Sequence, residues 1–471
     1  MMTRFLRFTA ISFVALGLAS AAHAQEARNV ILMISDGAGM TTWQAASHYR
    51  HGELGGEVYD GFDVHVFMST YSQGREGREA GSYEAAPAWD GTPAGDVFET
   101  RGGSYPQGFE GYRYLRTNPT DSAAAGTALA SGVKVHNGAL NIAPDGTRLA
   151  HIGQTLAANG GVFGSISDVY WSHATPAAFL AHNISRQNYE EIARQIVTDR
   201  AATVVMGAGH PYFDDNGLPR SGEDVDYSYV GGADTWQALS AGEAGWTLID
   251  TLEGFAALAS GEQEAAAGDR IIGTVPVAAT IRFGRDGEGM NDPLIPAVPD
   301  LATMSTGALN VLNAQDAPFF LMIEGGAVDW AAHSNNLPRI IEEQVAFNLA
   351  VEAVVDWVET HSSWEETLIV ITTDHGNGLL LGPDSLDEAF QNVIGQGAGM
   401  LPLARWHTDN HTNELVPLWA HGAGADRIRA KATQRDDGLA AWGITPENRI
   451  YLDNTALNRA MHDAMGLEFA N

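Results

Sequence analysis

Six short apolar runs recur along the chain, and stretches with helical spacing lie between them. The runs are rich in β-branched residues, as in NVILMIS at 29–35 and TLIVITT at 367–373, whereas the stretch at 339–361 has a helical pattern. Alternation of buried strands with helices predicts an α/β fold whose mostly parallel sheet is covered on both faces. The remaining runs are GVFGSIS at 161–167, ATVVMG at 202–207, PFFLMIE at 318–324 and LVPLWAH at 415–421.

The N-terminus has the pattern of a secretory signal. Arg4 and Arg7 precede the apolar stretch FTAISFVALGLAS, and AHA at 22–24 has the small-residue pattern of a cleavage site. We therefore expect residues 1–24 to be removed and residues 25–471 to form one domain. No later segment has the pattern of a membrane span, so we expect the protein to work in the periplasm or in the medium.

The region 76–112 differs from the rest of the chain because it is rich in Gly, Pro and aromatic residues and has few strand signals. This composition predicts a long inserted loop. Such a loop could cover an active site or reach a partner subunit, and the alternative is a solvated loop without a catalytic role. A second irregular stretch is expected at 212–235.

Composition narrows the possible functions. The chain has 58 Asp and Glu against 26 Lys and Arg, a formal net charge of −32, which argues against binding nucleic acid or an anionic membrane through a basic face. There is no cysteine, so thiol catalysis, thiolate ligands and disulfides are excluded. An anionic substrate would be repelled by this charge unless local cations attract it, and metal ions are the obvious candidates.

Three acids stand where apolar strands are expected to end. Asp36 follows the run at 29–35 and precedes a glycine, Glu324 ends the run at 318–324 before two glycines, and Asp374 follows the run at 367–373. Ligand sites of parallel sheets lie at the carboxyl ends of the strands. Carboxylates gathered there would repel one another, so the pattern predicts a shared metal site.

Histidines and a further acid extend this pattern. Asp329 and His333 are four residues apart, which places them on one face of a helix turn, in a spacing suited to two metal ligands. His375 directly follows Asp374, and His411 lies just before the run at 415–421. Each histidine taken singly is more often a surface or core residue, but together they could serve more than one divalent ion.

Ser122 lies in the stretch NPTDSAAAGTALASG, where it follows an acid and opens a run of small residues. One interpretation is an ordinary helix N-cap. The other is a nucleophile at a helix N-terminus, where backbone N–H groups attract a phosphate.

Six blocks of sequence stand out between residues 36 and 422. They are SDG, TDSAAAGTALASGVKVHNGAL, HATPAAFLAH with SR close behind, IEGGAVDWAAH, TTDHG and HTNELVPLWAHG. These blocks resemble the signature blocks of the alkaline phosphatase family and occur in that family's order. The resemblance implies a three-layer α/β/α sandwich, a phosphoserine intermediate, two zinc ions and one magnesium ion, small phosphomonoester substrates and a homodimer.

The resemblance also implies a role for each matching position. Ser122 matches the nucleophile, Arg186 the arginine that holds phosphate oxygens, and Asp121 the acid that steadies that arginine. The implied metal ligands are Asp329, His333 and His411 for one zinc, Asp36, Asp374 and His375 for the other, and Asp36, Thr175 and Glu324 for magnesium.

Two positions vary within the family that the chain resembles. His173 stands where some members have aspartate; we expect it either to be a ligand at the third metal or to form a hydrogen bond beside it. Trp330 stands where some members have lysine. It brings no charge to the phosphate, so we expect product to leave more easily, and the alternative is that it only packs.

Two other functions remain open at this point. A phosphodiesterase of the same superfamily could share the metal ligands, although the Ser122 and Arg186 blocks favour monoesters. A secreted phosphate- or metal-binding protein without turnover would bind its ligand equally well without Ser122. A sulfatase is disfavoured, because the chain has neither cysteine nor an S-x-P-x-R motif.

Overall fold

Eleven strands form one central sheet in the computed structural model of the chain, which describes residues 26–471 except 76, 78–80, 101–102 and 291. Their spatial order is β14-β15-β2-β13-β10-β1-β9-β5-β6-β8-β7. The strands are β1 (Asn29–Ser35), β2 (Val64–Ser69), β5 (Val162–Tyr170), β6 (Val204–Ala208), β7 (Thr247–Ile249), β8 (Ile271–Thr274), β9 (Phe319–Gly325), β10 (Thr367–Thr372), β13 (Val416–Gly422), β14 (Gln434–Arg435) and β15 (Ile450–Asp453).

The sheet is mostly parallel, as the sequence predicts. All neighbours from β10 through β1, β9, β5, β6 and β8 to β7 are parallel. Strand β13 is the exception within the main body of the sheet, because it runs antiparallel to both β10 and β2. The reversal matters for the site, since it brings the start of β13 to the edge of the sheet where β10 ends.

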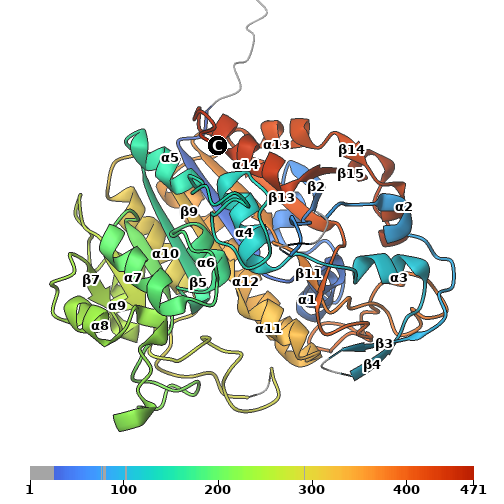
Figure 1. Cartoon of the computed structure of the whole chain (residues 1–471), viewed down its shortest axis with the longest axis horizontal. Helices are drawn as coiled ribbons and strands as arrows, with labels where there is room; N and C mark the ends of the chain where they lie inside the picture. The colour runs from blue at the N-terminus through green and yellow to red at the C-terminus, as the bar shows by residue number, and fades with distance from the viewer. Residues whose placement is uncertain (1–25, 76, 78–80, 101–102, 291) are drawn as a thin grey trace, which may run out of the picture.

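Helices cover both faces of the sheet, so the predicted three-layer sandwich is confirmed (Figure 1). Alternate residues of β1 enter opposite cores: Val30 and Leu32 pack in one, Ile31 and Met33 in the other. The first core includes helices α4 (Ser122–Ser131), α5 (Ile152–Ala158), α7 (Tyr189–Asp199), α13 (Ala425–Lys431) and α14 (Asn454–Ala464), and the second includes α1 (Met40–His51), α9 (Leu252–Ser260), α10 (Leu301–Asn313) and α12 (Leu337–His361).

All six predicted strands are present, and their ends differ from the prediction by at most three residues. The helix predicted at 339–361 is α12, which begins two residues earlier because Asn336 caps it by accepting a hydrogen bond from the backbone of Arg339. The irregular stretch 212–235 contains two short 3₁₀ turns, η2 (Gly222–Asp224) and η3 (Ser228–Val230), and then α8 (Ala233–Ser240) begins.

The described part of 76–112 holds more regular structure than the loop expected there. It contains the short helix α2 (Ala85–Ala88), a hairpin of β3 (Val97–Thr100) and β4 (Gly103–Pro106), and the start of α3 (Glu110–Leu115). Strands of four residues are too short for an alternation pattern to be read from sequence. The hairpin lies near α11 (Ala327–His333) in Figure 1, and the Tyr105 hydroxyl donates a hydrogen bond to Asn335 just beyond that helix.

Two sequence predictions concern the relation of the chain to membranes. Among the described residues, no helix combines the length and apolarity needed to cross a bilayer. The predicted leader at 1–24 lies outside the described residues.

Candidate active site

Three fully buried carboxylates meet at one edge of the sheet, as the strand-end argument predicts. Asp36 follows β1, Glu324 lies in β9 and Asp374 comes two residues after β10. The register explains why they meet: Ile34 of β1 pairs with Glu324 on one side and with Thr372 on the other.

These carboxylates and His375 form what we call the acid cluster (Asp36, Glu324, Asp374 and His375). His375 Nε2 lies 3.1 Å from Asp374 Oδ2 and 3.5 Å from Asp36 Oδ1. The Thr175 hydroxyl donates to Asp36 Oδ2 at 3.3 Å. Three buried oxygens of the cluster accept no hydrogen bond from the described residues, and they are Asp36 Oδ1, Asp374 Oδ2 and Glu324 Oε1.

The acid cluster has too little positive charge for its carboxylates. Burial, followed by the charge of Asp374, raises the pKa of Asp36 well above its ordinary value. Burial also raises the pKa of Glu324 to about 8 and that of Asp374 to about 6. His375 brings no compensating charge, because burial and then the neighbouring His411 hold its pKa well below the ordinary value.

His173 lies beside this cluster as the N-cap residue of α6 (Ala174–Ala178). Ligand atoms of Asp36, His173 and Glu324 lie within 4.8 Å of one another. Burial, followed by the charge of Arg186, lowers the pKa of His173 to about 3, so the ring is neutral. Its Nε2 then accepts a hydrogen bond from the Arg186 guanidinium at 3.0 Å.

A second group, the imidazole cluster (Asp329, His333 and His411), lies next to the first. Helix α11 carries Asp329 and His333, and the predicted spacing of four brings their side chains to 3.3 Å. His411 lies 3.4 Å from Asp329 and 3.1 Å from His333 Nε2. It reaches this edge because β13 is antiparallel; a residue preceding a parallel strand would lie at the opposite edge.

Charges in the imidazole cluster compensate one another. Although burial pushes the pKa of Asp329 upward, His333 and His411 hold it well below the ordinary value. Burial lowers the pKa of His333, but Asp329 raises it to about 9. The His333 and His411 Nδ1 atoms lie 2.7 Å and 2.8 Å from backbone carbonyl oxygens, so each ring turns its Nε2 toward the carboxylate.

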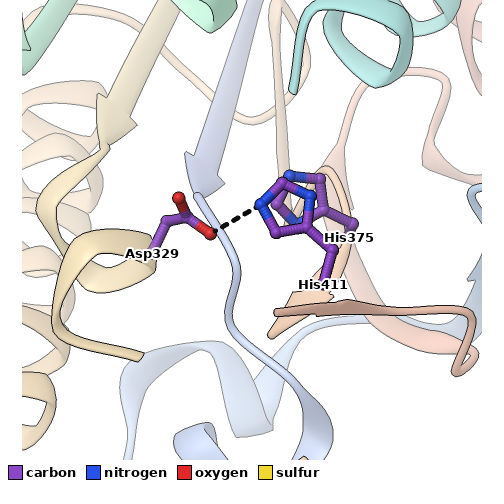
Figure 2. A group of neighbouring side chains, drawn as sticks. All are labelled: Asp329, His375 and His411. Carbon is purple, nitrogen blue, oxygen red and sulfur yellow. Dashed lines mark ion pairs between the residues drawn. The ribbon is translucent and has the colours of Figure 1, made fainter. Parts of the chain in front are cut away.

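The two clusters meet at a pair of histidine rings. Figure 2 shows His375 and His411 overlapping, with the ion pair from His411 to Asp329 beside them. The ring centroids are 3.7 Å apart and the planes are tilted by 22°. Ligand atoms of Asp329, His375 and His411 also lie within 4.8 Å of one another, so the clusters form one continuous polar centre.

Ser122 lies against this centre and does not cap its helix. Asp121 is the N-cap of α4, since its carboxylate accepts a hydrogen bond from Ala124 N at 3.0 Å, and Ser122 is the first helical residue. The capping interpretation of Ser122 is therefore wrong. The Ser122 hydroxyl is buried, and its Oγ lies 3.2 Å from His375 Nε2.

A pocket of about 410 Å³ joins Ser122 to Arg186 and the imidazole cluster. The Arg186 guanidinium is held from two sides, by Asp121 at 3.3 Å and by His173 at 3.0 Å. Trp330 also lines the pocket and is half-buried, so it is not simply a core residue. A helix N-terminus, a guanidinium and the imidazole cluster thus line one space, and Ser122 connects it to the acid cluster through His375, an arrangement that suits a tetrahedral anion.

Several residues of the site were not identified from sequence. Ser167 donates to Glu324, and Asn377 donates to Asp329 Oδ1 at 2.7 Å. Ser167 could have been found, because it ends the run expected at 161–167 and pairs in register with Glu324. The aromatic residues Tyr170, Tyr189 and Phe283 also line the pocket, and nothing in their local sequence signals this.

Comparisons of the chain with a family model, with curated proteins and with solved structures all find alkaline phosphatases. The family model described as alkaline phosphatase matches residues 108–440. Alkaline phosphatase 4 of Bacillus subtilis (strain 168) is 31% identical over 383 residues, which cover 68% of this chain and 75% of that protein. The structure of alkaline phosphatase from the Antarctic bacterium TAB5 matches with a TM-score of 0.62 at 20% identity, covering 94% of this chain and 99% of that one. A mutant of that Antarctic enzyme, with a histidine replaced by glutamate, has Mg bound in the M3 site.

Proposed function

The chain belongs to the alkaline phosphatase family, and on this premise we propose that it hydrolyses phosphate monoesters through a phosphoserine formed on Ser122. One observation carries the proposal: the Ser122 hydroxyl lies at a helix start, in the same pocket as Arg186 and between two groups of metal-type ligands. A nucleophile, an anion grip and sites for divalent cations are what phosphoryl transfer to a serine requires.

The donor sets fit two zinc ions and one magnesium ion. The imidazole cluster offers nitrogen and oxygen ligands to one zinc, and Asp36, Asp374 and His375 offer the same to the second. Asp36, Thr175 and Glu324 offer the oxygen ligands that magnesium prefers, and His173 lies beside them. The buried carboxylate oxygens without hydrogen-bond partners support this assignment, because each has a lone pair free for a cation. When bound, the ions would supply Lewis-acid stabilisation of the oxygens that gain charge.

The residues of the pocket would act as follows. Ser122 Oγ attacks phosphorus as its proton is lost, the bond from phosphorus to the alcohol oxygen breaks, and the alcohol leaves with those electrons and takes up a proton. Arg186 holds the non-bridging oxygens with its planar pair of donors, and Asp121 and His173 fix the orientation of that guanidinium. Water then attacks phosphorus and loses a proton, the bond from phosphorus to Ser122 Oγ breaks, phosphate is released, and Ser122 Oγ takes up a proton.

The decisive experiment uses purified protein at alkaline pH. We expect hydrolysis of p-nitrophenyl phosphate that a chelator abolishes and that zinc and magnesium together restore, with much slower hydrolysis of bis(p-nitrophenyl) phosphate. Mass spectrometry of acid-quenched protein is expected to find a phosphate on the peptide that contains Ser122. Faster hydrolysis of the diester would favour a phosphodiesterase, and phosphate binding without turnover in the metal-loaded protein would favour a binding protein.

Two further expectations belong to this proposal. Export with cleavage after Ala24 is expected from the N-terminal pattern, and sequencing of the N-terminus of secreted protein would test it. A homodimer is expected from the family, and light scattering in solution would test that.

A further inference from the structure

Four aromatic rings line the pocket that contains Ser122, and we call them the aromatic wall. They come from separate segments: the end of β5, the first residue of α7, helix α11 and the stretch between β8 and α10. Three of the four are only half-buried, so their rings retain contact with solvent. The aromatic wall consists of Tyr170, Tyr189, Phe283 and Trp330.

The rings that surround Trp330 contact it edge-on. Phe283, Tyr170 and His173 all meet the Trp330 ring at steep angles of 67–85°, with centroids 5.9–6.4 Å away. Such edge contacts hold the indole in place but do not cover its face with a parallel ring. Tyr170 is supported in turn by Tyr229, which stacks on it at 4.0 Å. A planar ligand can therefore stack in the offset geometry that aromatic pairs favour.

The polar groups of the pocket are placed for a single phosphate. Among the described residues that line it, Arg186 is the one guanidinium and there is no lysine. A second anionic group on the substrate would find no further guanidinium or ammonium group there, and the net charge of −32 would repel it. By contrast, covering exposed aromatic rings with an apolar group lowers the free energy of the complex.

The aromatic wall lies in the pocket where the leaving alcohol of the substrate would be held. In an in-line displacement the alcohol oxygen departs on the side of phosphorus opposite Ser122 Oγ. Ser122 of α4, Trp330 of α11 and Phe283 all line this pocket, so the aromatic wall is the apolar surface that the pocket offers to a leaving group. We propose that the aromatic wall selects phosphate monoesters whose leaving alcohol carries a planar aromatic ring, an inference that rests on the proposed function.

Adenosine 5′-monophosphate and ribose 5-phosphate provide a matched test, because both release a primary 5′-alcohol and differ in the adenine base. With the metal-loaded enzyme, we expect kcat/KM for adenosine 5′-monophosphate to exceed that for ribose 5-phosphate about 10-fold, the size of effect that one stacked base gives. The difference is expected mainly in KM, since stacking acts on the bound substrate before the transition state as well as in it.

Substitution of Phe283 tests whether the aromatic wall causes the preference for adenosine 5′-monophosphate. Phe283→Ala is expected to reduce the ratio of the two kcat/KM values to about 2, and the ratio is the readout because it cancels any change in the catalytic centre that affects both substrates alike. Phe283→Leu keeps apolar bulk without a flat ring and is expected to behave similarly. Phe62→Ala is the control, because Phe62 stacks on His421 at the end of β13 remote from His411.

The outcomes separate the two proposals. Equal kcat/KM values for the two substrates in the wild-type enzyme, or a ratio unchanged in Phe283→Ala, would overturn the aromatic selection and leave the phosphomonoesterase standing. No hydrolysis of either substrate or of p-nitrophenyl phosphate by metal-loaded enzyme would overturn both.

Discussion

The imidazole cluster and the acid cluster meet at two stacked histidine rings, yet their charges are balanced in opposite ways. In the imidazole cluster, Asp329 faces His333 and His411, and the pKa of His333 rises to about 9 while that of Asp329 falls. In the acid cluster, three buried carboxylates share one imidazole whose pKa is lowered, and the carboxylate pKa values all rise.

The two halves of the site therefore differ in how far they depend on a bound cation. The imidazole cluster neutralises itself through hydrogen-bonded ion pairs and would keep its geometry without metal. The acid cluster lacks a counter-charge of its own, so its carboxylates can all be ionised together only when a cation is bound.

The largest effect is expected at Ser122, where the nucleophile touches the junction of the two clusters. Ser122→Ala removes the hydroxyl that would carry the phosphate, and we expect kcat for p-nitrophenyl phosphate to fall by at least about 10³-fold. Ser131→Ala is the matched control on the same helix, since that hydroxyl only donates to the Thr127 carbonyl. A residual rate above a tenth of the wild-type rate would remove Ser122 as the nucleophile.

The second prediction compares one acid from each cluster in chelator-treated protein at pH 8. Asp329→Asn leaves His333 without its carboxylate, and because 39% of the His333 side chain is exposed and screened by solvent we expect the free energy of unfolding to fall by about 1–2 kcal/mol. Asp36→Asn relieves repulsion among buried carboxylates, and we expect the free energy of unfolding to rise by about 1 kcal/mol. Thermal unfolding of the two variants measures both changes.

The test is whether Asp329→Asn and Asp36→Asn change the free energy of unfolding in opposite directions. Asp356→Asn, an exposed position on α12, is the control for the substitution itself. If both cluster variants lost stability equally in metal-free protein, the acid cluster would not be the half that needs a cation.

Much of this arrangement could be predicted from sequence because strand ends are easy to locate. Buried β-branched runs revealed β1, β9 and β10, and the rule for parallel sheets then placed Asp36, Glu324 and Asp374 at one edge. The spacing of four residues also predicted that Asp329 and His333 lie on one face of a helix turn, and their side chains are in contact.

The rest depended on long-range pairing that no local pattern encodes. His411 joins the site because β13 is antiparallel to β10. The apolar run at 415–421 does not indicate whether its strand is parallel or antiparallel to its neighbours. Phe283 reaches the pocket from a stretch without regular structure, so its place is set by tertiary packing alone. From the sequence, Ser122 could be either the cap or a nucleophile at the helix start, because Asp and Ser are both good caps and only the geometry distinguishes them.

A third prediction concerns the pH dependence of stability in chelator-treated protein. Glu324 has a pKa raised from 4.5 to about 8, so its protonated form stabilises the fold below pH 4.5, and that contribution is lost as pH rises to 8. His333 has a pKa raised from 6.5 to about 9, so its contribution is complete below pH 6.5 and is lost as pH rises through 9. We expect stability to fall by about 1 kcal/mol per pH unit for the fully buried Glu324 within its range, and by less for His333, whose side chain is 39% exposed and screened by solvent.

Single substitutions separate these two ranges. Glu324→Gln is expected to flatten the fall between pH 4.5 and 8, and His333→Gln to flatten it between pH 6.5 and 9, as measured by urea unfolding across the series. Saturating metal is expected to remove the Glu324 component, because a cation then favours the ionised carboxylate. An unchanged profile in Glu324→Gln would contradict the assignment of that component to the acid cluster.

The smallest effects are expected at the residues that orient the carboxylates. Asn377 donates to Asp329 Oδ1 at 2.7 Å, and Ser167 donates to Glu324, so each supports one cluster without being a proposed ligand. Loss of such a donor typically weakens metal binding about 10-fold. Asn377→Ala is therefore expected to lose zinc at about 10-fold lower chelator concentration with magnesium unaffected, and Ser167→Ala to lose magnesium first.

Metal analysis after dialysis against graded chelator measures both losses, and Asn310→Ala is the control, because that amide bonds to carbonyls at the end of α9. The acid cluster has the greater need for its ion, so Ser167→Ala should also lower the unfolding temperature when magnesium leaves. Asn377→Ala should not, since the ion pair between Asp329 and His333 persists without metal. Equal losses of stability in the two variants would show that both clusters depend on their ions alike.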